Sequence, residues 1–236
     1  MMENMRVTSI FVDEAMGSNE THRVTRKFLD DLVEAFCAKN NRYFEAWKAE
    51  KEGIANVPCF PILCEENQMS SIFSAAINQV SPIHLSEKKV KSAREKNSKE
   101  PKSGNADFYV RYQGIDISLE LKRKHENEKD VQQRWNFVCY QAKRHVVNST
   151  CERTVGVGLM VVLTEPTKDK NATYDKLVGR LNQPLKEIKI HLKKEKDEEH
   201  RQEKPIMAWQ VCLPGQREDA NGKRFDELFI VACVFP

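Results

Sequence analysis

The sequence predicts an α/β fold in which a mixed central β-sheet is flanked by helices. Two neighbouring segments, 106–112 and 115–122, alternate between apolar and polar residues, which is typical of a β-hairpin. Apolar residues recur at helical spacing before and after this hairpin, over 61–80 and 128–147. Residues 154–163 are almost continuously apolar, which favours a strand buried on both faces.

The hairpin has a defined register if Gln113-Gly114 is its two-residue turn, because glycine tolerates a positive φ. Tyr112 then lies opposite Ile115, and Asp107 lies opposite Glu120. Period-2 geometry separates an apolar face from a polar one. The polar face carries Asp107, Tyr109, Arg111, Asp116, Ser118, Glu120 and Lys122.

The paired acids Asp107 and Glu120 are the first candidate for chemistry. Two carboxylates directly opposite each other repel by roughly a few tenths of a kcal/mol or more. A cation between them would remove this cost, and hard divalent ions such as Mg²⁺ bind carboxylates of this kind. The hairpin therefore predicts a divalent metal site.

The segments Asn105-Ala106-Asp107 and Glu120-Leu121-Lys122 together resemble the signature of the PD-(D/E)XK nuclease superfamily. Ala106 stands where the name of the superfamily has proline. The resemblance covers roughly residues 60–165. It implies a restriction-endonuclease-like core with the element order αβββαβ.

The resemblance also implies roles for individual residues. Asp107, Glu120 and the main-chain carbonyl of Leu121 would hold Mg²⁺, for which Mn²⁺ can substitute. Glu66 would bind this ion directly or through water, and Glu65 is the alternative to Glu66. Lys122 would orient or activate the attacking water, and in-line attack would leave a 5′-phosphate and a 3′-hydroxyl.

Other interpretations of these residues exist. Glu-x-Lys also occurs at Glu87, Glu100 and Glu187, although only Glu120 lies in an alternating strand that follows a strand with an acid. The polar face of the hairpin could simply be solvated. The acids at 65 and 66 could instead complement the positive end of a helix dipole.

Basic and polar residues near the hairpin are candidates for binding nucleic acid. Such side chains neutralise phosphates and make binding dependent on salt. The alternatives are a solvated, mobile loop over 86–104 and a solvated helix face. The candidates are Lys88, Lys89 and Lys91 before the hairpin, Arg123 and Lys124 after it, and Gln141 and Arg144 on the second helix.

The remaining segments are expected to extend this core into one compact domain. An N-terminal helical extension, 1–58, contains a helix over 21–52 that packs on the core region, 59–236. A long helix is predicted over 172–204. Two C-terminal strands, 207–213 and 228–235, are expected to join the same sheet, connected by a loop that Pro214-Gly215 and Asn221-Gly222 mark.

Composition narrows the class of protein. The chain of 236 residues has a net charge of +3, so overall charge is a weak argument for nucleic acid. Its seven cysteines include no CxxC pair, which indicates a reducing compartment, and the absence of a signal peptide predicts a cytoplasmic protein. No apolar run reaches the ~18–20 residues that cross a bilayer, so a membrane partner is not expected.

The sequence as a whole predicts a Mg²⁺-dependent endonuclease that hydrolyses phosphodiester bonds, with DNA as the expected substrate. A role in restriction, repair or defence against phage fits equally well. Two alternatives are an inert member of the same fold that only binds nucleic acid or protein, and an unrelated α/β protein whose hairpin mimics the motif. The sequence does not distinguish DNA from RNA as the substrate. It also does not decide whether the chain forms a homodimer.

Overall fold

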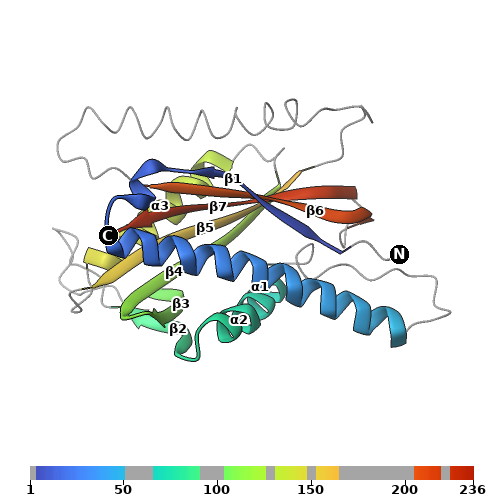
Figure 1. The fold of residues 1–236 in the computed structure, drawn as a ribbon, viewed down its shortest axis with the longest axis horizontal. Helices are drawn as coiled ribbons and strands as arrows, with labels where there is room; N and C mark the ends of the chain where they lie inside the picture. The colour runs from blue at the N-terminus through green and yellow to red at the C-terminus, as the bar shows by residue number, and fades with distance from the viewer. Residues whose placement is uncertain are drawn as a thin grey trace.

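The described part of the chain in the computed structural model folds around one mixed β-sheet (Figure 1). The described residues are 4–50, 66–90, 104–125, 131–147, 153–164, 205–218 and 224–236. Their elements are β1 (Arg6–Val12), η1 (Glu14–Gly17), α1 (Glu20–Glu50), α2 (Glu66–Val80), β2 (His84–Val90), β3 (Gly104–Tyr112), β4 (Ile115–His125), α3 (Val131–Val147), β5 (Thr154–Thr164), β6 (Ile206–Glu218) and β7 (Arg224–Phe235). The seven strands lie in the order β1-β6-β7-β5-β4-β3-β2, which confirms the predicted α/β class.

The hairpin formed by β3 and β4 has the predicted register. Gln113 and Gly114 have φ values of 47° and 81°, and two positive values are what a type I′ turn requires. Tyr112 pairs with Ile115, and Phe108 pairs with Leu119. The register places Asp107 and Glu120 on neighbouring strands and on the same face.

The connection from β4 to β5 places α3 on this same face of the sheet. The two strands are parallel, with Glu120 beside Gly158, so the chain must cross back over the sheet between them. Helix α3 makes this crossing and packs on both strands. From α2 to β5 the elements follow one another as helix, three strands, helix and strand.

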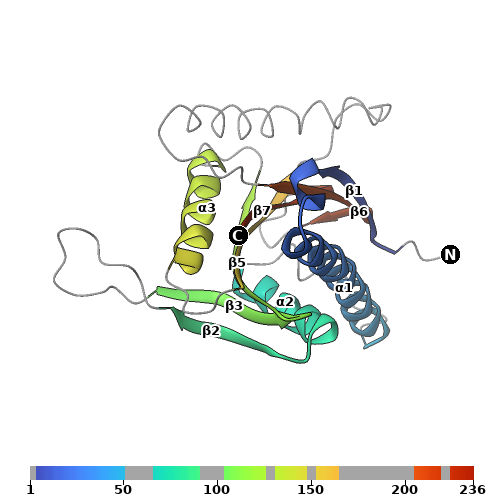
Figure 2. The same cartoon turned by 60° about the vertical axis from the view of Figure 1, so that its left-hand side comes forward.

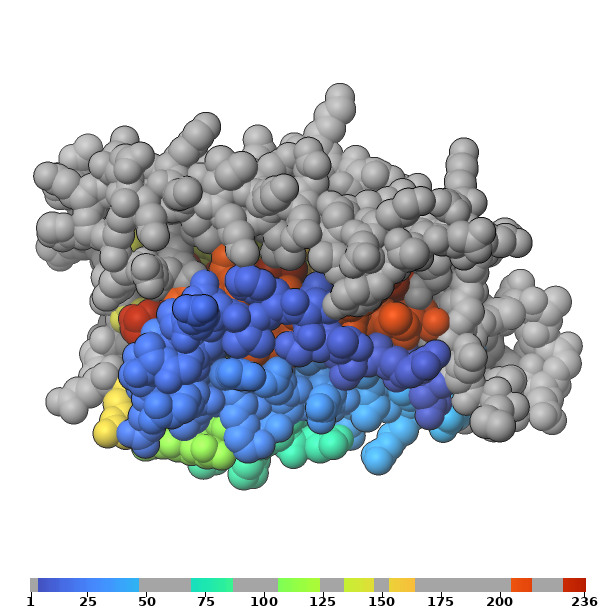
Figure 3. All heavy atoms as spheres, turned by 45° about the horizontal axis from the view of Figure 1, so that its top comes forward, coloured from blue at the N-terminus to red at the C-terminus, as the bar shows by residue number. Residues whose placement is uncertain are grey.

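Helices cover both faces of the sheet. Figure 2 shows α3 on one side and α1 with α2 on the other. The larger apolar core lies on the side of α1 and α2, where Phe36 and Phe73 stack with ring centroids 3.9 Å apart. The atoms of α1, coloured blue, spread across this side of the molecule in Figure 3. The apolar face of the predicted hairpin contributes Phe108, Val110, Tyr112, Ile115, Ile117, Leu119 and Leu121 to this core.

Two acids of α1 fix the helix on the sheet through hydrogen bonds. The hydroxyl of Tyr112 donates to Asp31 at 2.8 Å, and the indole N–H of Trp209 donates to Asp30 at 2.9 Å. Burial and the hydrogen bond to Asp31 raise the pKa of Tyr112 to about 12, which keeps its hydroxyl a donor. Helix α1 is therefore part of the core, as the helical stripe over 21–52 predicted.

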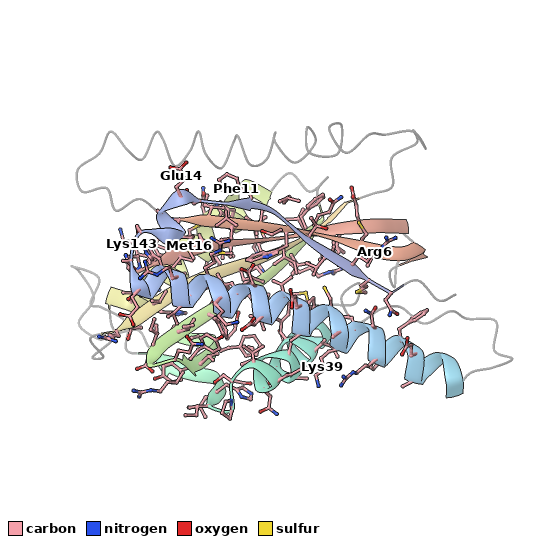
Figure 4. The ribbon with its side chains drawn as sticks, viewed as in Figure 1. Arg6, Phe11, Glu14, Met16, Lys39 and Lys143 are labelled. Atoms are coloured by element: carbon pink, nitrogen blue, oxygen red, sulfur yellow. The ribbon has the colours of Figure 1, made fainter. Side chains whose placement is uncertain are left out.

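The structure adds a strand at the N-terminus, where the sequence analysis assigned only helix. Strand β1 pairs antiparallel with β6 and forms one edge of the sheet. The turn η1 follows, and its Met16 is fully buried between this edge and α1 (Figure 4). Residues on both sides of the predicted boundary at 58 therefore contribute to one sheet.

Two other local predictions need correction. Residues 84–90 form the regular edge strand β2, although a mobile loop was predicted from residue 86, because pairing with β3 satisfies their backbone groups. Pro214 and Gly215 lie within the range of β6 rather than in the connecting loop. They fall in the part of β6 where its register with β7 shifts, between Cys212 and Arg217. The helix predicted over 172–204 lies outside the described residues.

Within the described residues, no helix has both the length and the apolar character needed to cross a membrane.

Candidate active site

Asp107, Glu120 and Lys122 form one cluster on the face of the sheet that α3 covers. The ammonium nitrogen of Lys122 lies 3.3 Å from Asp107 Oδ2 and 3.3 Å from Glu120 Oε1. The same nitrogen donates a hydrogen bond to the main-chain carbonyl of Leu121 at 2.8 Å. Oxygens from three of the four residues that the resemblance assigned to metal, Asp107, Glu120 and Leu121, therefore converge on one cation.

The carboxylate of Asp107 is held across the hairpin by the backbone of β4. Its Oδ2 accepts a hydrogen bond from the N–H of Leu121 at 2.7 Å. This bond fixes the position of an acid on β3 relative to Glu120 on β4. The distance between the two acids consequently depends on the register of the hairpin rather than on flexible side chains alone.

The polar face of β4 is buried, so the interpretation of this face as solvated is wrong. Glu120 is 5% exposed and Lys122 is 8% exposed. The side chain of Asp107 is 33% exposed, so the cluster reaches solvent on the β3 side. Burying a charged group costs several kcal/mol of free energy per ion unless partners compensate. Stability alone is therefore a poor reason for an acid–lysine group at this position.

Two glycines of β5 allow α3 to bury the cluster. Gly156 and Gly158 lie beside Ser118 and Glu120 in the β4–β5 pair. A Cβ atom at Gly156 would clash with the backbone carbonyl of Ala142 in α3, and one at Gly158 would lie 2.6 Å from a Val138 methyl. The helix backbone therefore approaches the sheet where these two residues have no side chain.

His145, in the last turn of α3, is a further polar residue near the cluster. It is 3% exposed, and neither ring nitrogen has a hydrogen-bond partner in the described structure. Burial lowers the pKa of His145, the charge of Asp107 opposes this shift, and Arg144 adds to it. His145 shares the buried stripe of Val138 and Ala142, which pack on Gly158 and Gly156 beside the strand of Glu120, so it lies on the side of the cluster.

Gln141 and Arg144 were the residues predicted to have a role on this helix, and His145 was not among them. The sequence feature that indicates His145 is its helical spacing from apolar residues. It lies three residues after Ala142 and seven after Val138, so it belongs to the buried stripe rather than to the solvated face. A histidine in a buried stripe above a predicted polar strand face is a candidate for contact with that face.

The cluster has the chemistry of a site for a hard cation. Carboxylate and carbonyl oxygens are the ligands that Mg²⁺ takes in proteins, usually one or two carboxylates together with water. In the described part of the chain, no three side chains of the His, Cys, Asp or Glu type gather where they could hold a metal. Asp107 and Glu120 supply two carboxylates, and the third oxygen belongs to the backbone of Leu121.

The predicted third acid, Glu66, is the first residue of α2. Helix α2 packs on the core side that contains Leu119 and Leu121, opposite the face of Glu120. The side chain of Glu66 and the whole of Glu65 lie outside the described residues. A role of either acid in metal binding stays a prediction.

The predicted nucleic-acid contacts are spread over three elements. The backbones of Lys88 and Lys89 lie on the edge strand β2. Their side chains, the side chain of Lys124 and the whole of Lys91 are outside the described residues. Alternation along β4 places Arg123 on the face opposite that of Lys122. Gln141 and Arg144 are half-buried on α3, on the side of the sheet that carries the cluster.

The fold and the cluster define an α/β protein that carries a buried acid–lysine group between a β-hairpin and a crossover helix. Comparisons of the chain with protein-family models, with curated proteins and with solved structures find no match. The functional assignment therefore depends on the geometry of the cluster and on the residues that form it.

Proposed function

We propose that this protein is a Mg²⁺-dependent nuclease of the PD-(D/E)XK type that hydrolyses phosphodiester bonds of DNA. The single observation that carries the proposal is the convergence of Asp107, Glu120 and the Leu121 carbonyl on the ammonium of Lys122. The order of elements from α2 to β5 supports it, because it is the order of the restriction-endonuclease-like core.

The residues of the cluster fit a divalent ion. Asp107, Glu120 and the Leu121 carbonyl are oxygen donors of the type that Mg²⁺ and Mn²⁺ bind. A bound divalent ion would lower the pKa of a coordinated water and neutralise charge on the phosphate. The hydrogen bond from the Leu121 N–H to Asp107 would hold the donor set in place before the ion arrives.

Lys122 would act on the reacting groups rather than on the fold. Its ammonium and the metal would compete for the same oxygens, so binding of the ion would move Lys122 Nζ away from the carboxylates. The lysine would then be available to orient the attacking water and to stabilise charge that develops on the phosphate. Helix α3 would keep bulk water from Glu120 and Lys122, which strengthens electrostatic interactions at the site.

The direct test is cleavage of defined substrates by the purified protein. Supercoiled plasmid, linear duplex, single-stranded DNA and RNA of the same sequence are incubated with Mg²⁺, with Mn²⁺ or with EDTA. We expect cleavage with either metal and none in EDTA. Ligation of the products should reveal 5′-phosphate and 3′-hydroxyl ends.

A matched pair of variants excludes a contaminating nuclease. Asp107→Asn should abolish cleavage, whereas Asp116→Asn should retain most of it, because Asp116 is an acid on the same face that pairs with Arg111 rather than with Lys122. Absence of cleavage on all four substrates, with folded protein and intact metal binding, would favour an inert member of the fold.

A further inference from the structure

The outer face of α3 exposes two aromatic side chains beside arginines. Phe137 is 42% exposed and Tyr140 is 52% exposed, so both place large rings in solvent. The guanidinium carbon of Arg134 lies 5.9 Å from the centre of the Phe137 ring, and that of Arg144 lies 5.5 Å from the centre of the Tyr140 ring. We call Arg134, Phe137, Tyr140, Lys143 and Arg144 the α3 surface.

The charge of the α3 surface has one sign. Helix α3 contains Arg134, Lys143 and Arg144 and no aspartate or glutamate. Lys143 is exposed, and its side chain is labelled in Figure 4. The surface thus combines exposed aromatic rings, each with an arginine over one face, with positive charge. This combination is complementary to a polyanion whose bases are flat rings.

The α3 surface adjoins the candidate active site along the helix. His145, Gln141 and Phe137 follow one another at intervals of four residues, so their side chains form one continuous ridge. His145 is the buried member of this ridge, on the side of α3 that packs against the sheet face of the cluster. The ridge therefore leads from the side of the cluster to the exposed aromatic rings.

We propose that the α3 surface binds single-stranded nucleic acid. Phe137 and Tyr140 stack on unpaired bases, while Arg134, Lys143 and Arg144 contact the phosphates between them. Duplex bases are stacked on one another and expose no face to an aromatic side chain, which is why the rings select unpaired strands. The choice of nucleic acid as the ligand rests on the proposed function, and the inference adds the class of substrate.

A second copy of the chain is a poorer occupant of this surface. Two α3 surfaces facing each other would oppose arginines and lysines of like charge, which disfavours association. A strand with regularly spaced phosphates and free bases matches both properties of the surface at once.

The test measures binding without turnover. Fluorescence anisotropy of a labelled oligothymidylate and of a labelled DNA duplex is recorded in EDTA, for the parent and for Phe137→Ala, Tyr140→Ala and the double variant. Gel filtration compares the size of the parent with that of the double variant. Loss of one stacked base typically costs about 1–3 kcal/mol, so each single variant should weaken binding by roughly 5- to 150-fold. Tyr140→Phe should bind like the parent, because it keeps the ring.

Tyr43→Ala is the matched control, because Tyr43 is an exposed aromatic residue on α1, on the other side of the sheet. It should leave affinity unchanged. Arg134→Gln together with Arg144→Gln should lower the salt slope by about 0.7 for each phosphate contact that is lost. Thermal melting of each variant confirms that the fold persists.

The outcomes separate this inference from the proposed function. Tight single-strand binding that depends on both rings, with no cleavage when metal is added, would refute the nuclease and leave the inference standing. Unchanged oligothymidylate affinity in the double variant would overturn the inference, even if the protein cleaves DNA. Equal losses on duplex and single-stranded DNA would also overturn it, as would a parent dimer that the double variant dissociates.

Discussion

At the scale of single residues, Lys122 determines how the buried carboxylate of Glu120 and the partly exposed carboxylate of Asp107 coexist. Its ammonium lies 3.3 Å from an oxygen of each acid and 2.8 Å from the Leu121 carbonyl. These oxygens are the ones proposed for the metal, so the lysine and a divalent ion exclude each other from the same position. Metal affinity is then a direct probe of the cluster.

We predict that calorimetry with Mn²⁺ detects one site in the parent protein. Asp107→Ala and Glu120→Ala should each remove binding, because each deletes a carboxylate ligand. Lys122→Ala should instead bind Mn²⁺ more tightly, because no ammonium competes for the oxygens. Identical isotherms for the parent and both acid variants would rule out this site.

His145 should make stability depend on pH. Its pKa is lowered from 6.5 in the folded protein, chiefly by burial. As the pH falls below 6.5, the unfolded chain takes up a proton on His145 more readily than the folded chain does. The stability that the neutral imidazole contributes is therefore present above pH 6.5 and is lost as the pH decreases.

Thermal melts between pH 7.5 and 5 check this prediction. His145→Gln removes the titrating group, so the melting temperature of this variant should fall less steeply with decreasing pH than that of the parent. Parallel curves for the two proteins would mean that His145 titrates alike in the folded and unfolded chains.

At the scale of elements, the close contact between α3 and β5 holds the helix on the face of the sheet that carries the cluster. We predict that Gly156→Ala destabilises the protein by about 1–3 kcal/mol or more, because the new methyl group would overlap the Ala142 carbonyl and push the helix away. Activity should fall as well, since the same helix covers Glu120 and Lys122.

Urea unfolding compares this variant with Gly17→Ala. No atom lies within 4 Å of a Cβ added at Gly17, so that change should alter stability by only about ±0.5 kcal/mol. Equal unfolding midpoints for the two variants would show that α3 is not in close contact with the sheet.

The edge strand β2 carries two adjacent lysines, Lys88 and Lys89. Lysines on an edge strand discourage pairing with further strands, and Lys88 and Lys89 are suited to this purpose as well as to phosphate binding. We predict that Lys88→Ala with Lys89→Ala weakens DNA binding and lowers the salt slope by about one unit for each lost contact, without changing Mn²⁺ affinity. If the salt dependence of DNA binding is unaltered, these lysines only discourage the pairing of further strands with β2.

At the scale of the whole molecule, features that depend on local sequence patterns were predictable, whereas features that depend on long-range contacts were not. The alternation of 106–122 and the turn at Gln113-Gly114 were sufficient to place Asp107, Glu120 and Lys122 on one face. The burial of that face was not predictable, because it depends on α3 lying over glycines far away in the sequence. Strand β1 was not predicted for a similar reason. Its partner, β6, is distant in the sequence, and the strand is only partly buried.

We propose that Lys122 serves catalysis and not merely the fold. The most direct measurement is the single-turnover cleavage rate of Lys122→Ala at saturating Mn²⁺, with DNA affinity and melting temperature recorded for the same preparation. We expect a rate about 10²–10³-fold lower than that of the parent, because one electrostatic contact to the transition state is lost. Lys122→Arg should recover only part of it, because a planar guanidinium replaces a compact ammonium. A folded Lys122→Ala protein that cleaves at the parent rate would contradict the proposed mechanism, even with Mn²⁺ bound at Asp107 and Glu120.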